Sequence, residues 1–219
     1  MGANYSMVEP EVDDSNDQVS EENYFNNIRK INYENDNLLR FHEISGTNVT
    51  FDSTYTRAKR TDGFCNAIVV SSRPLRVNEI LYLKFNSVSD CWRGFMRFGV
   101  TCKDPYFNEN DIKNARYVCP DLTNKKGYWA RAMNDDVKDN DVFYFYINDE
   151  GNMYYGINNV FKGLFFEDLK IKPDTKLWPI CDIYGNVTSI ELVGKSLKRI
   201  SFKNLNMQMK TLRCLTSWH

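Results

Sequence analysis

Hydrophobic and polar residues alternate one by one along several stretches of the chain after residue 38. Successive side chains of a β-strand point to opposite faces, so a period of two indicates strands with one face buried. In Asp141–Asn148, for example, Phe143, Phe145 and Ile147 share one face, with Tyr144 and Tyr146 opposite. The clearest stretches are Glu79–Phe85, Phe95–Thr101 and Asp141–Asn148.

Turn-forming residues separate these stretches at short intervals, as in Ser45-Gly46, Asp149-Glu150-Gly151 and Tyr184-Gly185-Asn186. Parallel strands would need crossover connections of about ten residues or more, for which there is no room. The pattern therefore predicts an all-β fold, a two-sheet antiparallel β-sandwich of about eleven or twelve short strands. Residues 103–127 are expected to form a long loop, and loops of that length are usually functional or disordered.

Charge divides the chain into three parts. Residues 1–23 hold seven acids and no Lys or Arg, whereas residues 195–219 hold six bases and no acid. We expect a disordered acidic arm over 1–37, a folded domain over 38–194 and a basic tail over 195–219. Acids and bases balance in the body of the chain, which argues against a nucleic-acid partner because phosphates need a basic face.

The chain shows no residue pattern that is typical of catalysis or metal binding. Its six cysteines include no C-x-x-C pair, and His42 and His219 are its only histidines, so neither a metal nor a cofactor is expected. Asp104, Asp121 and Asp182 are carboxylates, but nothing in their spacing brings two of them to one substrate. The lack of a signal-peptide core at the N-terminus favours reduced thiols and a cytoplasmic location.

Six ordered segments carry a resemblance to a known family. They are Gly63–Ile68 followed by Ser71-Ser72-Arg73-Pro74, Trp92–Thr101 with Asp104-Pro105, Tyr117–Leu122, Gly127–Ala130, Leu164–Phe166 and Leu177–Gly185. In order and spacing they resemble the neuralized homology repeat (NHR) of the Neuralized family. The resemblance covers roughly residues 39–194.

The resemblance implies a sandwich related to SPRY-type, concanavalin-like jelly rolls. It also implies a protein-recognition module without a catalytic residue, with the intracellular tails of Notch ligands as partners in ubiquitin-dependent endocytosis. Ligases of the family carry a RING, which needs about eight Cys/His ligands. After Gly194 this chain has only Cys214 and His219. The alternative is a short form or fragment of a RING ubiquitin ligase that acts only with a RING-bearing partner.

The amino terminus Met1-Gly2-Ala3-Asn4-Tyr5-Ser6 fits the N-myristoylation pattern M-G-x-x-x-[ST], and a similar start occurs in some Neuralized proteins. The alternative is a chance match. One myristoyl chain binds membranes only marginally, and the basic tail is the one candidate second signal, unless it is simply a solvated end. If Gly2 is lipidated, we expect peripheral contact with the plasma membrane or endosomes, or a structural membrane adaptor without peptide recognition.

Aromatic and charged residues near the expected loop and at strand ends are the candidates for partner binding. Trp129 follows the loop, although tryptophans at strand starts more often pack in cores. The arginines at strand ends would meet an acidic or amide-rich peptide, or are ordinary surface charges. Arg97 is either a solvent-side residue or a buried charge that fixes a loop. The predicted partner-binding residues are Arg60, Arg73, Tyr117, Asp121, Tyr128 and Trp129.

Overall fold

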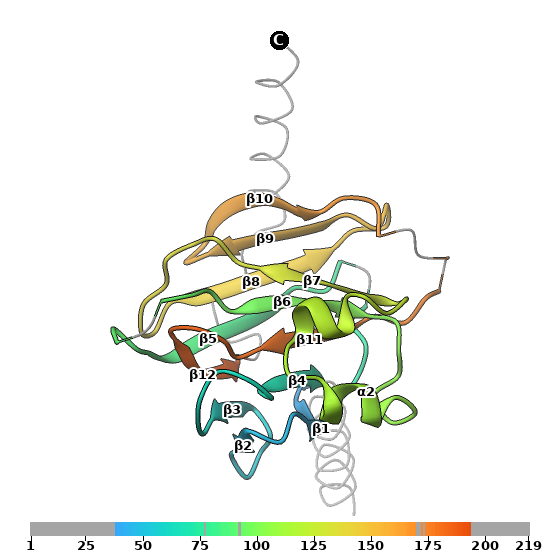
Figure 1. Ribbon diagram of the computed structural model, residues 1–219. Coiled ribbons are helices and arrows are strands. Elements are labelled where there is room, and N and C mark those ends of the chain that lie inside the picture. Colours follow the sequence, from blue (N-terminus) through green and yellow to red (C-terminus); the bar gives the residue numbers. More distant parts are fainter. Residues whose placement is uncertain (1–37, 77, 92, 170–171, 173, 194–219) are drawn as a thin grey trace, which may run out of the picture. The chain divides into compact units, whose positions relative to one another are not determined.

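The described chain folds into twelve strands in two antiparallel sheets (Figure 1). The computed structural model describes residues 38–193, except residues 77, 92, 170–171 and 173. The all-β, two-sheet antiparallel sandwich expected from the alternation is confirmed. The predicted acidic arm, Gly2 and the basic tail 195–219 lie outside the described residues.

One sheet has five strands in the order β1-β4-β11-β6-β7. Its two outermost strands are therefore β1 and β7, and β11 lies at its centre. The strands are β1 (Phe41–Ser45), β4 (Ile68–Ser71), β6 (Arg97–Thr101), β7 (Tyr128–Ala132) and β11 (Trp178–Asp182).

The other sheet has seven strands in the order β10-β9-β8-β5-β12-β3-β2. Consecutive strands of the chain often lie in different sheets, as β4, β5 and β6 do, so loops cross the ends of the sandwich. The strands are β2 (Val49–Phe51), β3 (Arg57–Arg60), β5 (Leu81–Val88), β8 (Val142–Ile147), β9 (Met153–Ile157), β10 (Val160–Phe166) and β12 (Val187–Leu192).

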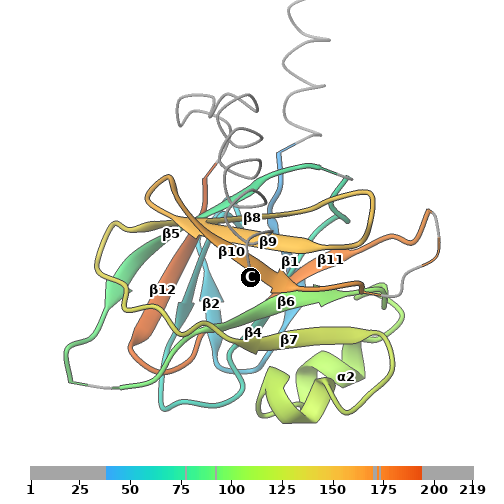
Figure 2. The same ribbon diagram turned by 90° about the horizontal axis from the view of Figure 1, so that it is seen from above.

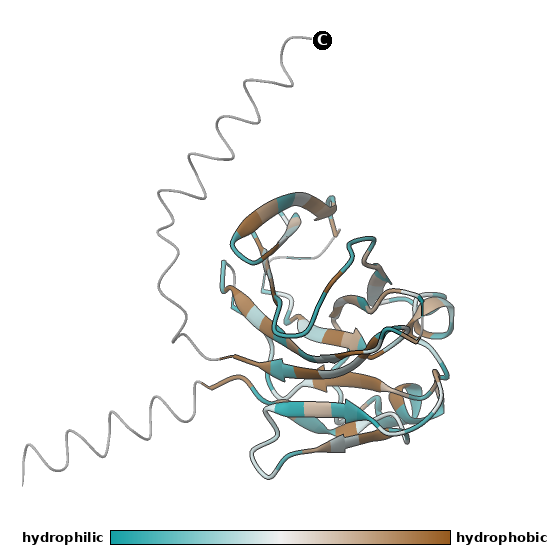
Figure 3. Cartoon of the chain, turned by 90° about the vertical axis from the view of Figure 1, so that its left-hand side faces the viewer, coloured by the Kyte–Doolittle hydropathy of each residue, from teal (hydrophilic) through white to brown (hydrophobic). Residues whose placement is uncertain are grey.

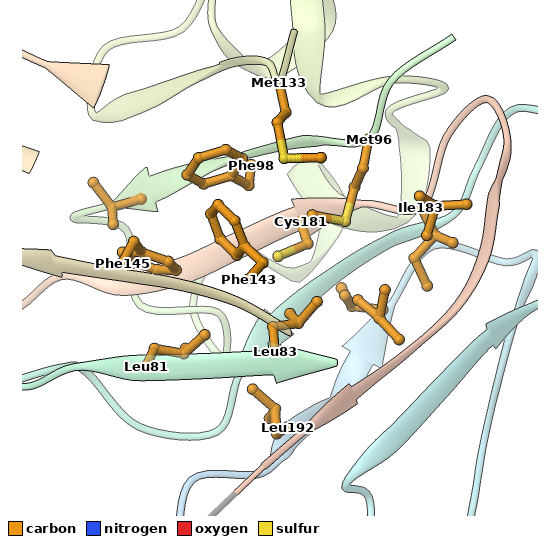
Figure 4. Close-up of a cluster of buried hydrophobic side chains, with 14 of the residues drawn as sticks. Leu81, Leu83, Met96, Phe98, Met133, Phe143, Phe145, Cys181, Ile183 and Leu192 are labelled. Carbon is orange, nitrogen blue, oxygen red and sulfur yellow. The ribbon is translucent and has the colours of Figure 1, made fainter. Parts of the chain in front are cut away.

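The main core lies between the two sheets and is rich in aromatic rings (Figure 4). Phe98 from β6 is fully buried, stacked on Phe165 at a centroid distance of 3.9 Å and edge-on to Phe143 at 4.3 Å. Hydrophobic and hydrophilic residues interleave along the strands, as the alternation in the sequence predicts (Figure 3). The core therefore joins both sheets through the faces that the period of two selects.

The segment 103–127 is more ordered than the predicted loop. It contains a short α-helix, α2 (Glu109–Asn114), and a helical turn, η1 (Val118–Leu122). Their residues Ile112, Val118 and Leu122 are buried against the outer face of the five-stranded sheet, on the side away from β8 and β9 (Figure 2). Burial of these side chains holds the segment in place, so its backbone is not a free loop.

The described residues also bear on membranes and thiols. The five cysteines among them are all free thiols. No helix in this part of the chain is both long and apolar enough to cross a bilayer.

Candidate partner-binding site

A buried ion pair stands at one end of the sandwich, where β11 stops at Asp182. The Asp182 side chain is fully buried, and its Oδ2 accepts hydrogen bonds from Arg97 Nη1 at 3.0 Å and from the Val118 amide at 3.1 Å. Its Oδ1 has no hydrogen-bond partner among the described residues. Burial raises the pKa of Asp182, and the Val118 amide and the Arg97 guanidinium oppose that rise. The ion pair ties β6 and η1 to the end of β11.

Two tyrosine rings pack against the Arg97 guanidinium. Its central carbon lies 3.7 Å from the ring centroid of Tyr184 and 5.1 Å from that of Tyr117. The two rings meet edge to face at 5.7 Å. Both tyrosines are half-buried, so each ring keeps part of its surface open to a partner. Cation–π contact fixes the rings without covering them fully.

Arg60, at the end of β3, fixes the turn that carries Tyr184. It is 6% exposed, and its Nη1 and Nη2 donate to the carbonyl oxygens of Ile183 and Gly185 at 3.2 and 2.8 Å. Its guanidinium also lies 5.2 Å from the ring centroid of Phe64, which is itself 6.0 Å from the ring of Tyr184. Arg60 therefore stabilises the turn that carries Tyr184, and its own side chain leaves little accessible surface for a partner.

A close backbone approach holds the same turn against the loop before β6. Gly185 has φ of +65°, and a Cβ there would lie 2.3 Å from the carbonyl oxygen of Gly94. The Asn186 amide donates to that same oxygen at 3.2 Å. A Cβ would clash at this distance, and glycine adopts the positive φ without strain, so a glycine at 185 lets the two loops approach this closely.

Asp121 positions the backbone at Arg116 and Tyr117, just before η1. Its Oδ2 accepts hydrogen bonds from the backbone amides of Arg116 and Tyr117 at 2.8 and 3.1 Å. The exposed Arg116 guanidinium lies 5.8 Å from the Tyr117 ring centroid. We call the resulting surface the aromatic–arginine patch, which consists of Phe64, Arg97, Arg116, Tyr117 and Tyr184.

The structure brings three of the six predicted residues together at this patch. Tyr117 belongs to it, while Arg60 and Asp121 hold it in place. The other three lie elsewhere, and each makes its own contacts there. They are Arg73, which pairs with Glu79 through two hydrogen bonds of 2.7 and 2.9 Å; Tyr128, which is 4% exposed and donates to Asp111 at 3.1 Å; and Trp129, half-buried against the main core.

Sequence reasoning did not single out Phe64, Tyr184 and Arg116. A signal was available for the first two, because each aromatic residue stands next to a turn glycine in one of the family segments. It also missed Tyr106 and Phe107, an exposed edge-to-face pair of which 69% and 79% of the surface is accessible. Among the described residues, no cluster of three or more His, Cys, Asp or Glu side chains is placed to hold a metal ion.

Comparison with known proteins gives one consistent result. The family model of Neuralized matches residues 41–194. Protein neuralized of Drosophila melanogaster is 40% identical over 161 residues, which are 73% of this chain and 21% of that protein. The human E3 ubiquitin-protein ligase NEURL1B is 33% identical over 157 residues, 70% of this chain and 28% of that protein. The chain thus spans only about a fifth to a quarter of these relatives.

A solved structure agrees with the sequence matches. The crystal structure of the Drosophila melanogaster neuralized NHR1 domain superposes with a TM-score of 0.68 at 40% identity, covering 72% of this chain and 99% of that one. The fold and the matched region define an NHR domain, a protein-interaction module found in a family of E3 ligases. The chain belongs to the Neuralized family, and the resemblance seen in the sequence is confirmed.

Proposed function

We propose that this chain is a recognition module that binds a peptide segment of a target protein at the aromatic–arginine patch. The observation that carries the proposal is the set of three half-buried rings, Phe64, Tyr117 and Tyr184, fixed around the buried Arg97–Asp182 pair. Rings held in one orientation lose little entropy when a partner covers them, which is why aromatic residues dominate binding hot spots.

The chemistry of the patch favours an extended segment with acidic or amide side chains. The exposed Arg116 guanidinium would pair with carboxylate or amide oxygens, while the rings would pack on aliphatic or planar groups. By resemblance we propose the intracellular tails of Notch ligands as the targets, and their ubiquitin-dependent endocytosis as the process. No catalytic residue of the chain takes part in this proposal.

Replacing Tyr117 by Ala and Phe64 by Ala tests the patch. Hot-spot truncations lose about 2 kcal/mol or more, which is roughly a 30-fold weaker affinity for a labelled Notch-ligand tail peptide in fluorescence anisotropy. Tyr106→Ala is the matched control, because it removes an exposed ring that lies outside the patch. Wild-type protein that is folded but does not bind the tails would reject this ligand class. Binding that survives both patch variants would reject the patch.

We also propose that the chain acts at the cytoplasmic face of the plasma membrane or of endosomes, through a myristoyl group on Gly2 and the basic tail 195–219. The support is the sequence pattern alone. Flotation of co-translationally myristoylated protein with liposomes tests it, with Gly2→Ala as the comparison. If Gly2→Ala floats as well as the parent, the lipid anchor is excluded.

A second candidate function is cooperation with a RING-bearing ligase. It is favoured by the relatives named E3 ubiquitin-protein ligases, of which this chain spans a fraction. In a ubiquitination assay, adding the chain to a full-length relative would stimulate transfer under this proposal. Inhibition would instead identify a competitor for the shared target.

A further inference from the structure

Two aromatic rings of β10 hold the Arg131 side chain of β7, and each of these strands is the outermost one at an end of its sheet. The Arg131 guanidinium carbon lies 4.3 Å from the ring centroid of Phe165 and 5.2 Å from that of Phe166. Phe165 in turn stacks on Phe98 in the main core at 3.9 Å. The guanidinium therefore rests on rings that are anchored inside the protein, and the cation–π contact fixes its position.

Trp129 lies beside Arg131 on the same face of β7. The two residues are two positions apart in a strand, so their side chains point the same way, about 7 Å from each other. Their partners in β6 are Val100 and Phe98, which both belong to the main core, so this face of β7 is the inner one. Trp129 is half-buried there and Arg131 is exposed, because β7 has no neighbour on its other side. We call the surface made by Trp129, Arg131 and the half-buried Phe166 the edge arginine site.

The polar groups of the edge arginine site are uncommitted. Among the described residues, the Arg131 guanidinium makes no hydrogen bond and no ion pair, and the Trp129 indole N–H has no acceptor. Asp135, in the loop after β7, already has two partners of its own. Its Oδ2 accepts a hydrogen bond from the Tyr155 hydroxyl at 2.8 Å, and its Oδ1 pairs with Lys162 at 2.8 Å. The site thus combines a fixed guanidinium with N–H groups that are available to a partner.

We propose that the edge arginine site binds an acidic segment of a partner protein, with Arg131 pairing with one carboxylate of that segment. A guanidinium presents parallel N–H groups whose spacing matches the two oxygens of a carboxylate. Trp129 and Phe166 flank the guanidinium, so apolar side chains next to that acid would pack on their rings. The indole N–H would donate to a backbone carbonyl of the segment. Tryptophan and arginine are also the residue types that most often carry the energy of a protein interface.

The charges around the site favour a carboxylate over a phosphate group. Burial raises the pKa of Tyr155 to about 12, Asp135 adds to the rise and Arg131 opposes it, so the acid and the base act on one neighbourhood. Lys162 is already paired with Asp135, which leaves Arg131 as the base available to a ligand. A phosphate group carries nearly two negative charges at neutral pH and would bring the second one towards Asp135. A single carboxylate matches a single guanidinium.

The edge arginine site is separate from the aromatic–arginine patch. Arg97 and Phe98 are consecutive in β6, so their side chains point to opposite faces of the five-stranded sheet. Arg97 lies on the outer face, where the Val118 amide of η1 shares its partner Asp182. Arg131 is in register with Phe98 and lies on the inner face. The two surfaces can therefore be tested one at a time, and the proposal for the edge site does not depend on the patch.

Selection from a phage-displayed library of random peptides tests the proposal. The bait is the full chain with Tyr117→Ala, which removes a ring of the patch and leaves the edge arginine site unchanged. Enriched peptides are synthesised, and their affinity is measured by fluorescence anisotropy for the bait and for the bait with Arg131→Gln. The matched control is Arg40→Gln, because Arg40 is exposed and has no ring contact among the described residues.

We expect enriched peptides that carry Asp or Glu next to an apolar residue. Their affinity should fall about ten-fold or more in Arg131→Gln, as for the loss of a hydrogen-bonded charge, and should stay at the bait's value in Arg40→Gln. Replacing the acid of the peptide by its amide should weaken binding to the bait by a similar factor. The NMR signal of the Trp129 indole N–H, assigned with Trp129→Phe, should shift when the peptide is added to the bait.

The NMR signal locates the bound peptide without any change at Arg131, so the test holds even if Arg131→Gln folds poorly. An unmoved Trp129 signal would overturn the proposal, as would enriched peptides without an acid. Equal affinity for the bait and for folded Arg131→Gln would overturn it too. A peptide in which phosphoserine replaces the acid and binds more tightly would overturn the choice of a carboxylate ligand.

Discussion

Replacing Arg97 by Ala should destabilise the domain far more than an ordinary loss of a surface ion pair. The substitution leaves the fully buried Asp182 carboxylate with the Val118 amide as its hydrogen-bond donor. Removing one partner of a buried pair strands an uncompensated charge, which costs about 3–5 kcal/mol. Lost packing between the guanidinium and the rings of Tyr117 and Tyr184 adds to the effect.

The chain contains a matched control for this substitution. Arg57 pairs with Glu191 at 2.9 Å, close to the 3.0 Å of the buried pair, but the two side chains are 54% and 28% exposed. Water screens such a pair, and its loss costs about 0–1 kcal/mol. Arg57→Ala therefore also removes an arginine from an ion pair of similar length, but it leaves no buried carboxylate without its partner.

The assay is urea denaturation of both variants and of Arg97→Ala/Asp182→Asn at pH 7. Because the asparagine carries no charge, the double variant should be more stable than Arg97→Ala alone. Equal losses for Arg97→Ala and Arg57→Ala would refute the reasoning, as would a double variant no more stable than the single one.

The pH dependence gives an independent check on the same pair. The folded pKa of Asp182 is raised above its unfolded value of about 3.9, so the folded state keeps a proton that the unfolded state has already lost. Stability therefore falls as pH rises from the unfolded pKa through the folded pKa. Without Arg97 the folded pKa rises further, so the deficit of Arg97→Ala should shrink as pH falls from 7 towards 4.

Three further outcomes are expected. Phe98→Ala should cost about 3–5 kcal/mol in urea denaturation, whereas Tyr106→Ala on the exposed loop should stay within about 0.5 kcal/mol; similar values would contradict the assigned core. The Cys181 thiol, 3% exposed and with its pKa raised to about 12 by burial, should resist iodoacetamide at pH 8 in the native state while the exposed Cys91 reacts, as peptide mass spectrometry would show. Burial raises the pKa of Glu79, but the hydrogen bonds from Arg73 and the Arg76 amide outweigh it and lower that pKa overall, so the contribution of Glu79 is present above pH about 4.3 and is lost below it; the melting-temperature gap between parent and Glu79→Gln should persist from pH 7 down to about 5 and close as pH falls below about 4.

Alternation in the sequence located the central strands well because a half-buried strand has to repeat every two residues. The stretch Asp141–Asn148 became β8 at Val142–Ile147, and Glu79–Phe85 became the first part of β5. Both sets of inward residues join the main core. The family segments then predicted the sandwich more specifically than periodicity alone allows.

Sequence periodicity could not predict that α2 and η1 pack on the outer face of the five-stranded sheet. The helix α2 has six residues, too few for a repeated stripe, and η1 has five. Ile112 and Val118 are buried because they meet strands that are distant in sequence, which no local period records. The segment therefore looked like a free loop, although tertiary contacts determine its conformation.

The partners of charged site residues could not be predicted from the sequence either. Arg60 and Arg73 look alike at strand ends, but Arg60 binds carbonyl oxygens about 120 positions away and Arg73 binds Glu79 six positions away. Sequence alone gives the charge of an arginine and not whether its partner is already inside the protein. Only Tyr117 of the predicted set both belongs to the patch and keeps exposed surface there.

Binding and folding are separable at some positions of the patch and inseparable at others. Arg97 holds two tyrosine rings and also neutralises Asp182, so its removal lowers stability and disturbs the patch together. Tyr117 contacts the Arg97 guanidinium only through its ring and takes no part in the ion pair with Asp182. Tyr117→Ala therefore removes binding surface while the ion pair stays intact. A Tyr117→Ala protein with the parent's melting temperature and a weakened affinity would therefore locate recognition at the patch. If the melting temperature of Tyr117→Ala falls together with its affinity, the ring serves the fold. Recognition would then have to be sought at the exposed Tyr106–Phe107 pair.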